Sequence, residues 1–220
     1  SFFRDPEIFE SLCKEVLPEI VKDKTSTNPL RIWIAGCSTG KEVYSIAISL
    51  HEYMSDKVSE IKIQIFATDL SEKSIAKARS GIYDKGEMDG LTAGQVQQFF
   101  TKINGSYQVK KTIRDMCVFA SHNFLKDPPF AKIDLISCRN VLIYLEPFLQ
   151  KKAFTTFHYS LKPKGYLLLG KSESVGGTSD YFIPLAPKEK IYSRKAFPGK
   201  FISTASTHSE EILRDTDYGL

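Results

Sequence analysis

The sequence has few of the features that mark disulfide-rich, zinc-binding or membrane-spanning proteins. It contains only four cysteines and four histidines, with no C-x-x-C pair and no H-E-x-x-H motif. We therefore expect reduced thiols, a cytoplasmic location and no bound metal. No apolar run approaches the length of a membrane span, so we expect neither a signal peptide nor membrane insertion. The net charge of +4 is too small to indicate a nucleic-acid-binding protein.

What remains is the composition of an ordinary folded domain. Hydrophobic residues make up 42% of the chain and charged residues 25%. A length of 220 residues suffices for one domain with a full core and a small insertion. Because the chain starts at Ser1 and not at methionine, we expect it to be part of a longer protein.

The stretch from Leu30 to Ser45 has the pattern of a buried strand, a tight turn and a helix. The apolar run I-W-I-A predicts the strand, and a turn bracketed by Gly36 and Gly40 follows it. Apolar residues at helical spacing come next, which places the turn at the start of a helix. In α/β proteins such a turn presents backbone N–H groups to a ligand.

The spacing within this turn excludes two common ligands. A dinucleotide fingerprint needs G-x-G-x-x-G, whereas the turn reads G-x-x-x-G. A P-loop needs four residues between its glycines and then Lys with Ser or Thr, whereas here Lys41 is followed by Glu42. A carboxylate at that point would repel a pyrophosphate. A neutral or cationic ligand such as S-adenosylmethionine suits the turn better.

Strand and helix patterns alternate along the chain and predict an α/β fold with a doubly wound, mostly parallel sheet. Before the first strand, Asp5 and Pro6 predict the N-cap and first residue of a helix that ends near Val21. Further strands are predicted at 61–67, 116–120, 133–137 and 166–169, with an antiparallel edge from 181–183 and 190–193. We divide the chain into an N-terminal helix and linker (1–29), a main domain (30–195) and a C-terminal linker or appendage (196–220).

Residues 82–116 interrupt this alternation and predict a small antiparallel insertion. Asn104-Gly105 lies between two short β-like runs, which is the strongest local signal for a hairpin. A two-residue turn fixes the register, so Tyr107 and Val109 should share a face that lies against the domain, with lysines outward. The basic residues on or near the exposed side are Lys102, Lys110, Lys111 and Arg114.

Polar residues follow the predicted strands at the edge of the sheet where a ligand would bind. Because the carboxyl ends of parallel strands meet at one edge, these side chains could converge on a pocket. Each also has a purely structural interpretation: Glu42 at a helix dipole, Asp69 as a cap, Asn123 in an Asx turn and Arg139 in an ion pair. The group consists of Ser38, Glu42, Asp69, Asn123, Arg139 and Asn140.

A series of motifs spanning about residues 1–195 resembles a known family. In order they are F-F-R-D, G-C-S-T-G-K-E-x-Y-S, A-T-D, H-N, S-C-R-N-V-L-I-Y and L-K-P-x-G-Y-L-x-L-G-x-S-E-S. This combination is similar to the CheR-type chemotaxis receptor methyltransferases, which esterify glutamate side chains of chemoreceptors. The motif D-P-P-F-x-K-x-D-L-I-S-C-R-N most resembles the version of the family found in CheB/CheR hybrid fusion proteins.

The resemblance implies a Rossmann-like class I methyltransferase fold and a set of site residues. S-adenosylmethionine would be the methyl donor and S-adenosylhomocysteine the product, with no metal. Arg4 and Tyr144 would flank the transferred methyl group. The cofactor contacts implied by the motifs are Arg4, Gly36, Ser38, Glu42, Asp69, Asn123, Phe124, Arg139 and Asn140. The family often has Glu where this chain has Lys41.

The resemblance also implies a partner, the cytoplasmic helices of chemoreceptors in bacteria. Some relatives grip a receptor C-terminal peptide through an extended hairpin turn. The two-residue turn here leaves no room for that extension, so we expect recognition without such tethering, and fusion to other signalling domains. Two other functions remain open: a module that senses S-adenosylmethionine without turnover, and a small-molecule methyltransferase.

Overall fold

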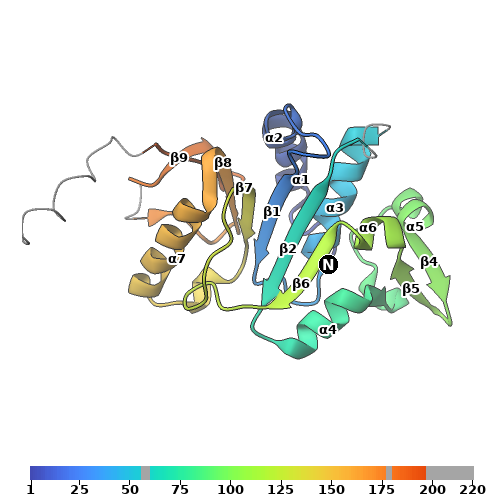
Figure 1. The fold of residues 1–220 in the computed structure, drawn as a ribbon. Coiled ribbons are helices and arrows are strands. Elements are labelled where there is room, and N and C mark those ends of the chain that lie inside the picture. The colour runs from blue at the N-terminus through green and yellow to red at the C-terminus, as the bar shows by residue number, and fades with distance from the viewer. Residues whose placement is uncertain (56–59, 177–179, 197–220) are drawn as a thin grey trace, which may run out of the picture.

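A seven-stranded sheet runs through the centre of the computed structural model (Figure 1), which describes residues 1–55, 60–176 and 180–196. The strand order is β6-β2-β1-β7-β8-β10-β9. The first five strands in this order are parallel, and β10 is antiparallel to both of its neighbours. The strands are β1 (Leu30–Ala35), β2 (Ile63–Asp69), β6 (Cys117–Ser121), β7 (Ile133–Cys138), β8 (Leu161–Leu169), β9 (Phe182–Ala186) and β10 (Ile191–Arg194). The predicted mostly parallel α/β sheet is confirmed.

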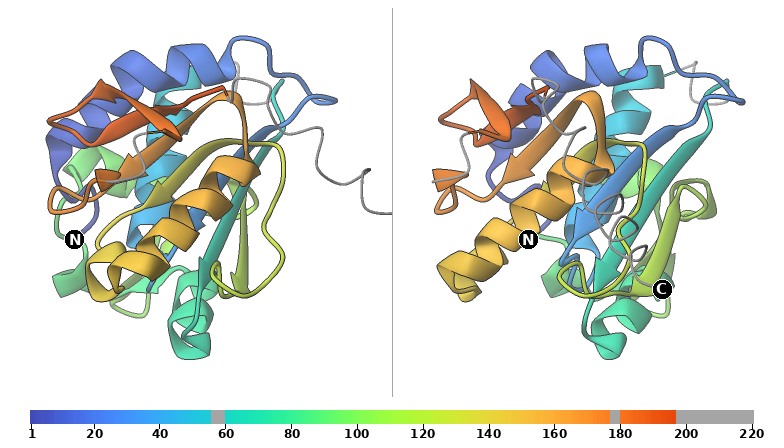
Figure 2. Two further views of the ribbon diagram at one scale, coloured as in Figure 1. Left: turned by 90° about the vertical axis from the view of Figure 1, so that its left-hand side faces the viewer. Right: turned by 60° about the vertical axis from the view of Figure 1, so that its left-hand side comes forward.

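The alternation of side chains along β1 explains how the two faces of the sheet are covered. Ile32 and Ile34 belong to a buried cluster with the helices at the N-terminal half of the chain. Trp33 and Ala35 belong to a second cluster, with α7 (Pro147–Ser160). Figure 2 shows α7 and the N-terminal helices on opposite sides of the sheet. The helices of the first side are α1 (Pro6–Ser11), a π-helical segment (Leu12–Val16), α2 (Leu17–Val21), α3 (Lys41–Met54) and α4 (Glu72–Ser80).

Residues 82–116 form the predicted insertion, with one strand more than the hairpin signal indicated. The strand order is β3-β5-β4, and Asn104 (φ 48°) and Gly105 (φ 86°) form the two-residue turn. Val109 is buried, and Tyr107 packs against the main core, as expected for the inner face. The elements are β3 (Ile82–Tyr83), a 3₁₀ turn (Lys85–Glu87), α5 (Ala93–Phe99), β4 (Phe100–Ile103), β5 (Ser106–Val109) and α6 (Lys111–Arg114).

Lys110 differs from the outward-pointing lysine that the sequence predicts. Its Nζ donates to the carbonyl oxygens of Gln97 (3.2 Å) and Gln98 (2.7 Å), which lie at the end of α5. The last carbonyls of a helix lack intrahelical donors, and the Lys110 ammonium supplies one. Lys110 therefore joins β5 to α5, whereas Lys102 and Lys111 are exposed.

Asp5 and Pro6 are the N-cap and first residue of α1, as predicted, but two local details differ from the sequence-based expectation because of contacts elsewhere in the fold. Asp5 occupies the N-cap position in a left-handed conformation (φ 61°) and makes no capping hydrogen bond, because its carboxylate pairs with Arg139. The strand predicted at 166–169 begins earlier, at Leu161, so that 162–165 lies within β8, at a break in the register with β7. Since β10 pairs only with 166–168, Pro163 loses no ladder hydrogen bond to that neighbour.

Across the described part of the chain, no helix has both the length and the apolar character needed to span a bilayer. In the same residues, no group of three His, Cys, Asp or Glu side chains is arranged to hold a metal ion. The four cysteines are free thiols.

Candidate methyl-donor site

The β1–α3 turn lies where the order of the parallel sheet reverses, between β1 and β7. The backbone N–H groups of Gly36 and Cys37 both donate to the carbonyl oxygen of Thr68, over 2.8 Å, which ties the turn to the end of β2. Gly36 has a φ of 75°, and a Cβ atom on it would overlap the side chain of Val141. The turn therefore packs directly against the segment that follows β7.

Two cavities lie beside this turn and share part of their walls. The first, of about 320 Å³, is lined by polar groups that include Arg4, Ser38 and Glu42. The second, of about 370 Å³, contains Asp69 and apolar side chains such as Phe124. Both cavities are lined by Gly36, Ser38, Asn140, Val141 and Tyr144. Together they form an elongated site that is charged at one end and largely apolar at the other.

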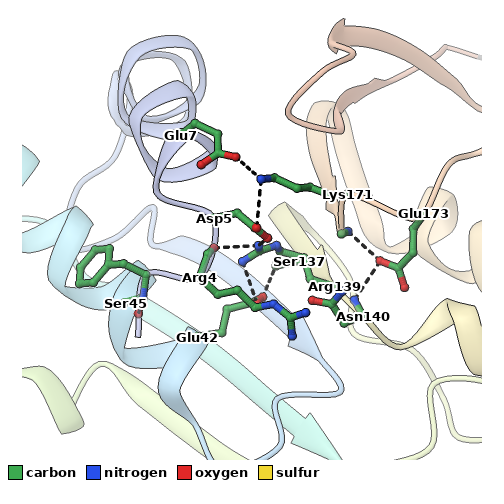
Figure 3. Close-up of polar contacts among 12 residues, drawn as sticks. Arg4, Asp5, Glu7, Glu42, Ser45, Ser137, Arg139, Asn140, Lys171 and Glu173 are labelled. Carbon is green, nitrogen blue, oxygen red and sulfur yellow. Dashed lines mark hydrogen bonds and ion pairs between the residues drawn. The ribbon is translucent and has the colours of Figure 1, made fainter. Parts of the chain in front are cut away.

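Glu42 and Arg139 form the charged centre of the first cavity (Figure 3). An Arg139 Nη1–H donates to Glu42 Oε2 over 3.1 Å, and the Ser137 hydroxyl donates to Glu42 Oε1 over 2.6 Å. The Arg139 side chain is 1% exposed, whereas Glu42 retains 22% exposure toward the cavity. The structural ion pair that we considered for Arg139 is therefore present, and Glu42 is the more exposed member of the pair.

Burial governs the acid–base behaviour of the groups that line the first cavity. Burial raises the pKa of Glu42, although the nearby Arg139 guanidinium and the Ser137 hydroxyl oppose the shift. Burial also raises the pKa of the Cys37 thiol to about 12, with a smaller contribution from Asp69. Cys37 is thus held as a neutral thiol at physiological pH and is not a nucleophile.

The N-terminal segment places Arg4 at the rim of the same cavity. The N–H of Phe3 donates to Ser45 Oγ over 2.9 Å, and the carbonyl oxygen of Arg4 accepts from Arg139 over 2.9 Å. The carboxylate of Asp5 pairs with Arg139 (2.7 Å) and with Lys171 (3.2 Å). Lys171 also pairs with Glu7 (Figure 3). Arg4 is exposed, but its backbone is fixed on both sides.

Asp69, at the end of β2, is engaged by backbone groups on both carboxylate oxygens. Its Oδ2 accepts from the N–H of Ser38 over 2.8 Å, and its Oδ1 accepts from the N–H of Ser71 over 2.9 Å. Ser71 caps α4 by accepting from the N–H of Ser74. Since each carboxylate oxygen has a second lone pair, Asp69 can still accept a hydroxyl donor in the second cavity.

The H-N motif after β6 forms the far wall of the second cavity. Asn123 Oδ1 accepts from the N–H of Leu125 over 3.0 Å, which is the Asx turn considered above as its structural role. The ring of Phe124 packs near that of Phe157, with the two centroids 5.5 Å apart. Phe124 and Leu125 thus supply apolar walls suited to a flat ring.

Tyr144 and Asn140 come from one short segment after β7. Asn140 has a left-handed backbone (φ 59°), and Tyr144 is 82% exposed at the mouth of both cavities. The segment is held by Glu173, whose carboxylate accepts hydrogen bonds from the N–H groups of Asn140, Val141 and Leu142. The sequence analysis did not assign a role to Glu173.

Comparison with known proteins identifies the family. The model for the CheR methyltransferase, S-adenosylmethionine-binding domain, matches residues 1–191. The chain belongs to the CheR methyltransferase family. S-adenosylmethionine is accordingly its cofactor, and the two adjoining cavities fit that molecule, since the polar one offers Glu42 to an ammonium group and the apolar one offers Phe124 to an adenine ring.

Several relatives within the family have been named. The chain is 38% identical over 186 residues to chemotaxis protein methyltransferase 1 of Pseudomonas aeruginosa, covering 82% of this chain and 68% of that protein. It is 34% identical over 195 residues to the chemotaxis protein methyltransferase of Borreliella burgdorferi, covering 86% and 69%. An uncharacterized 104.1 kDa protein of Rhodobacter capsulatus is 37% identical over 192 residues, which are 87% of this chain but only 20% of the relative.

Of the predicted site residues, all nine cofactor contacts and Tyr144 line one or both cavities. Sequence reasoning missed the residues that hold them in place. The signals were present in the motifs F-F-R-D and G-x-S-E-S, whose acidic residues the resemblance left without a role. The missed residues are Asp5, Ser45, Ser137, Lys171 and Glu173.

Proposed function

We propose that this domain transfers the methyl group of S-adenosylmethionine to glutamate carboxylates of chemoreceptors and forms methyl esters. The named relatives of P. aeruginosa and B. burgdorferi support the chemotaxis assignment. The observation that carries the choice of carboxylate is the make-up of the site mouth, where the cationic Arg4 and the phenolic Tyr144 stand at the same cavity. Such groups hold an anion.

The chemistry does not require a strong base. A glutamate side chain is already ionised at neutral pH and can attack the methyl carbon directly. The carboxylate oxygen forms the new C–O bond as the C–S bond breaks. The electron pair of the C–S bond stays on sulfur, which becomes the neutral thioether of S-adenosylhomocysteine. Among the described residues that line the two cavities, His122 is the one histidine, and its Nε2 is 3.1 Å from the carbonyl oxygen of Pro128. Positioning in line can supply ~7–11 kcal/mol of the barrier reduction.

Besides Arg4, which this proposal places at the substrate carboxylate, each predicted cofactor contact receives a role. Glu42 would bind the ammonium group, with Gly36 and Ser38 against the methionine portion. Asp69 would accept from the ribose hydroxyls, and the adenine would lie against Asn123 and Phe124. Asn140, on the shared wall, would contact the cofactor between its two ends. Arg139 is assigned an indirect role, because its Nη atoms bind Glu42, Asp5 and the backbone of Arg4.

The small sheet supports a proposal for how the receptor is recognised. Its turn is the two-residue Asn104-Gly105 loop, so a tethering peptide has no extended loop to grip. We propose that exposed Lys102 and Lys111 attract acidic receptor helices, or that fused domains hold the receptor nearby. The R. capsulatus relative, of which the matched region is only 20%, supports fusion within a longer protein.

A transfer assay tests the function. The domain would be incubated with methyl-labelled S-adenosylmethionine and a receptor cytoplasmic fragment, and then treated with mild alkali. We expect the label to be released as methanol, and a fragment with glutamine at the methylated positions to take up none. Label that survives alkali would indicate N-methylation, and binding of the cofactor without transfer to any receptor would indicate a sensor module.

A further inference from the structure

Glu173 is a carboxylate that the known chemistry of the site does not use. Glu173 lies on the loop after β8 and is 4% exposed. Both oxygens of its carboxylate accept hydrogen bonds from backbone N–H groups. Oε1 accepts from the N–H groups of Val141 (2.9 Å) and Leu142 (2.8 Å). Oε2 accepts from those of Asn140 (2.9 Å) and Gly170 (2.7 Å). One buried side chain thus binds three successive N–H groups of a single segment.

We propose that Glu173 is a positioning residue for methyl transfer. Its carboxylate fixes the backbone at 140–142 and, through it, sets the shared cavity wall and the position of Tyr144. The part of this inference that concerns Tyr144 rests on the proposed function. The part that concerns the wall shared by the two cavities rests on the geometry of the methyl-donor site alone.

The conformation of the segment explains why a carboxylate is needed. Asn140 adopts the left-handed region (φ 59°), which few residues other than glycine, asparagine and aspartate adopt. In that conformation, consecutive N–H groups point to one side and form a concave anion-binding nest. The acceptor of all three N–H groups is the carboxylate of Glu173. Without it these N–H groups would lose that acceptor, the Leu142 N–H in a buried position, and the conformation of the segment would no longer be fixed.

The position of the segment carries this effect to the site. Asn140 and Val141 line both cavities, and Val141 packs against the Gly36 turn so closely that a Cβ atom on Gly36 would overlap it. Tyr144 follows within one 3₁₀ turn, Leu142–Tyr144, whose buried residue is Leu142. A shift of Leu142 therefore moves Tyr144 as well. Figure 3 shows Glu173 and Glu42 on opposite sides of Asn140.

Glu173→Gln is the decisive variant, because it keeps the shape and replaces one acceptor oxygen by an amide NH₂ that faces N–H donors. We expect exchange of the 140–142 amide hydrogens to accelerate, and affinity for S-adenosylhomocysteine and kcat each to fall roughly ten- to a hundredfold. Glu173→Asp, which keeps both oxygens, should recover part of each loss. The matched control is Asp134→Asn, which alters a buried carboxylate at the opposite end of β7, bonded to Lys24, Lys162 and the N–H of Arg31. It should lower stability but leave affinity and kcat intact.

A double variant separates positioning from general destabilisation. If Glu173 acts through Tyr144, combining Glu173→Gln with Tyr144→Phe should lower kcat by less than the product of the two single effects. Fully multiplicative losses, or unchanged affinity and amide exchange in Glu173→Gln, would overturn the proposal. If the wild-type domain transfers no methyl group to receptors, the proposed function fails, whereas the affinity and exchange measurements still decide the role of Glu173.

Discussion

Arg139 and Asp5 are separated by 134 positions of sequence and are joined by an ion pair of 2.7 Å. The same guanidinium binds Glu42 and the carbonyl oxygen of Arg4. A single buried cation thereby holds together the first helix, the glycine turn and the end of β7. This arrangement determines the first prediction.

Arg139→Met should destabilise the fold. The variant leaves the carboxylates of Asp5 and Glu42 near each other without their cation, and breaking a buried pair in this way costs roughly 3–5 kcal/mol. We expect a loss of about 3 kcal/mol, since both carboxylates keep partial exposure. Urea denaturation measures it. Lys171→Met removes a half-exposed partner of Asp5 and should lower the free energy of unfolding much less than Arg139→Met does; equal losses would mean that Arg139 is not the centre of the network.

Affinity for S-adenosylhomocysteine should increase with pH because of Glu42. Burial holds the pKa of Glu42 above its usual 4.5, and the cationic ammonium of the ligand favours the ionised carboxylate. Binding therefore releases a proton, and affinity rises as the pH climbs from 4.5 through the raised pKa. Calorimetry in buffers of different ionisation enthalpy detects that proton. Glu42→Gln should bind more weakly and without this dependence; a variant that keeps the wild-type pH profile would exclude Glu42 as its source.

Asp69→Ala should weaken binding of S-adenosylhomocysteine by roughly ten- to a hundredfold, because it removes the acceptor proposed for the ribose and the partner of the Ser38 N–H. Asp69→Asn keeps one acceptor oxygen and should lose less. Calorimetry gives both dissociation constants. The control is Glu72→Gln, an exposed acid in the first turn of α4, which should bind normally. Equal affinity in the Ala variant would remove Asp69 from the ligand site.

Arg4→Ala and Tyr144→Phe should lower kcat far more than they lower cofactor affinity. Both side chains are proposed to stand where the substrate carboxylate meets the methyl group, so their contribution should appear mainly in the transition state. A loss of roughly tenfold or more in kcat, with a nearly unchanged dissociation constant for S-adenosylhomocysteine, is the expected result. Proportional losses of binding and turnover would assign these residues to ground-state binding instead.

Reversing the charge of the exposed hairpin lysines should raise KM for the receptor. Lys102→Glu with Lys111→Glu places negative charge where acidic helices are proposed to approach, and added salt should reduce the difference from wild type. Lys110 is left unchanged because it bonds the carbonyl oxygens of Gln97 and Gln98. Lys14→Glu with Lys22→Glu, at other exposed positions, is the matched control. An unchanged KM would leave the lysines as mere solubility groups.

A receptor C-terminal peptide provides a further check on the hairpin. We expect no binding in calorimetry, because the turn is limited to Asn104-Gly105. Micromolar binding would show that the small sheet recognises such peptides by another surface.

The parts of the fold that depend on local chemistry could be predicted from the sequence. The I-W-I-A run and its glycine turn form β1 and the start of α3, and Asn104-Gly105 forms the expected hairpin. The predictions were incomplete where a residue distant in sequence determines the local conformation or hydrogen bonding. Asp5 is the predicted N-cap of α1, but its carboxylate pairs with the buried Arg139 and makes no capping hydrogen bond. Pro163 lacks an N–H, yet it lies within β8, because β10 pairs only with residues 166–168 and needs no donor from Pro163.

The candidate site shows the same division. Residues that end strands were predictable, because parallel strands bring their carboxyl ends to one edge. Glu173 was not, because it has no pattern of its own: its function follows from three N–H groups that turn toward it only after Asn140 adopts a left-handed conformation.

The course of the first five residues has a practical consequence for labelling and fusion. Ser1 lines the polar cavity together with Arg4, and the N–H of Phe2 donates to the carbonyl oxygen of Asp89, beside the small sheet. Any polypeptide joined ahead of Ser1 therefore leaves the fold at the rim of the donor cavity. A fluorophore coupled to the α-amino group of Ser1 should change its emission when S-adenosylhomocysteine binds, which offers a direct titration signal. An affinity tag at that end would share the space through which the ligand enters.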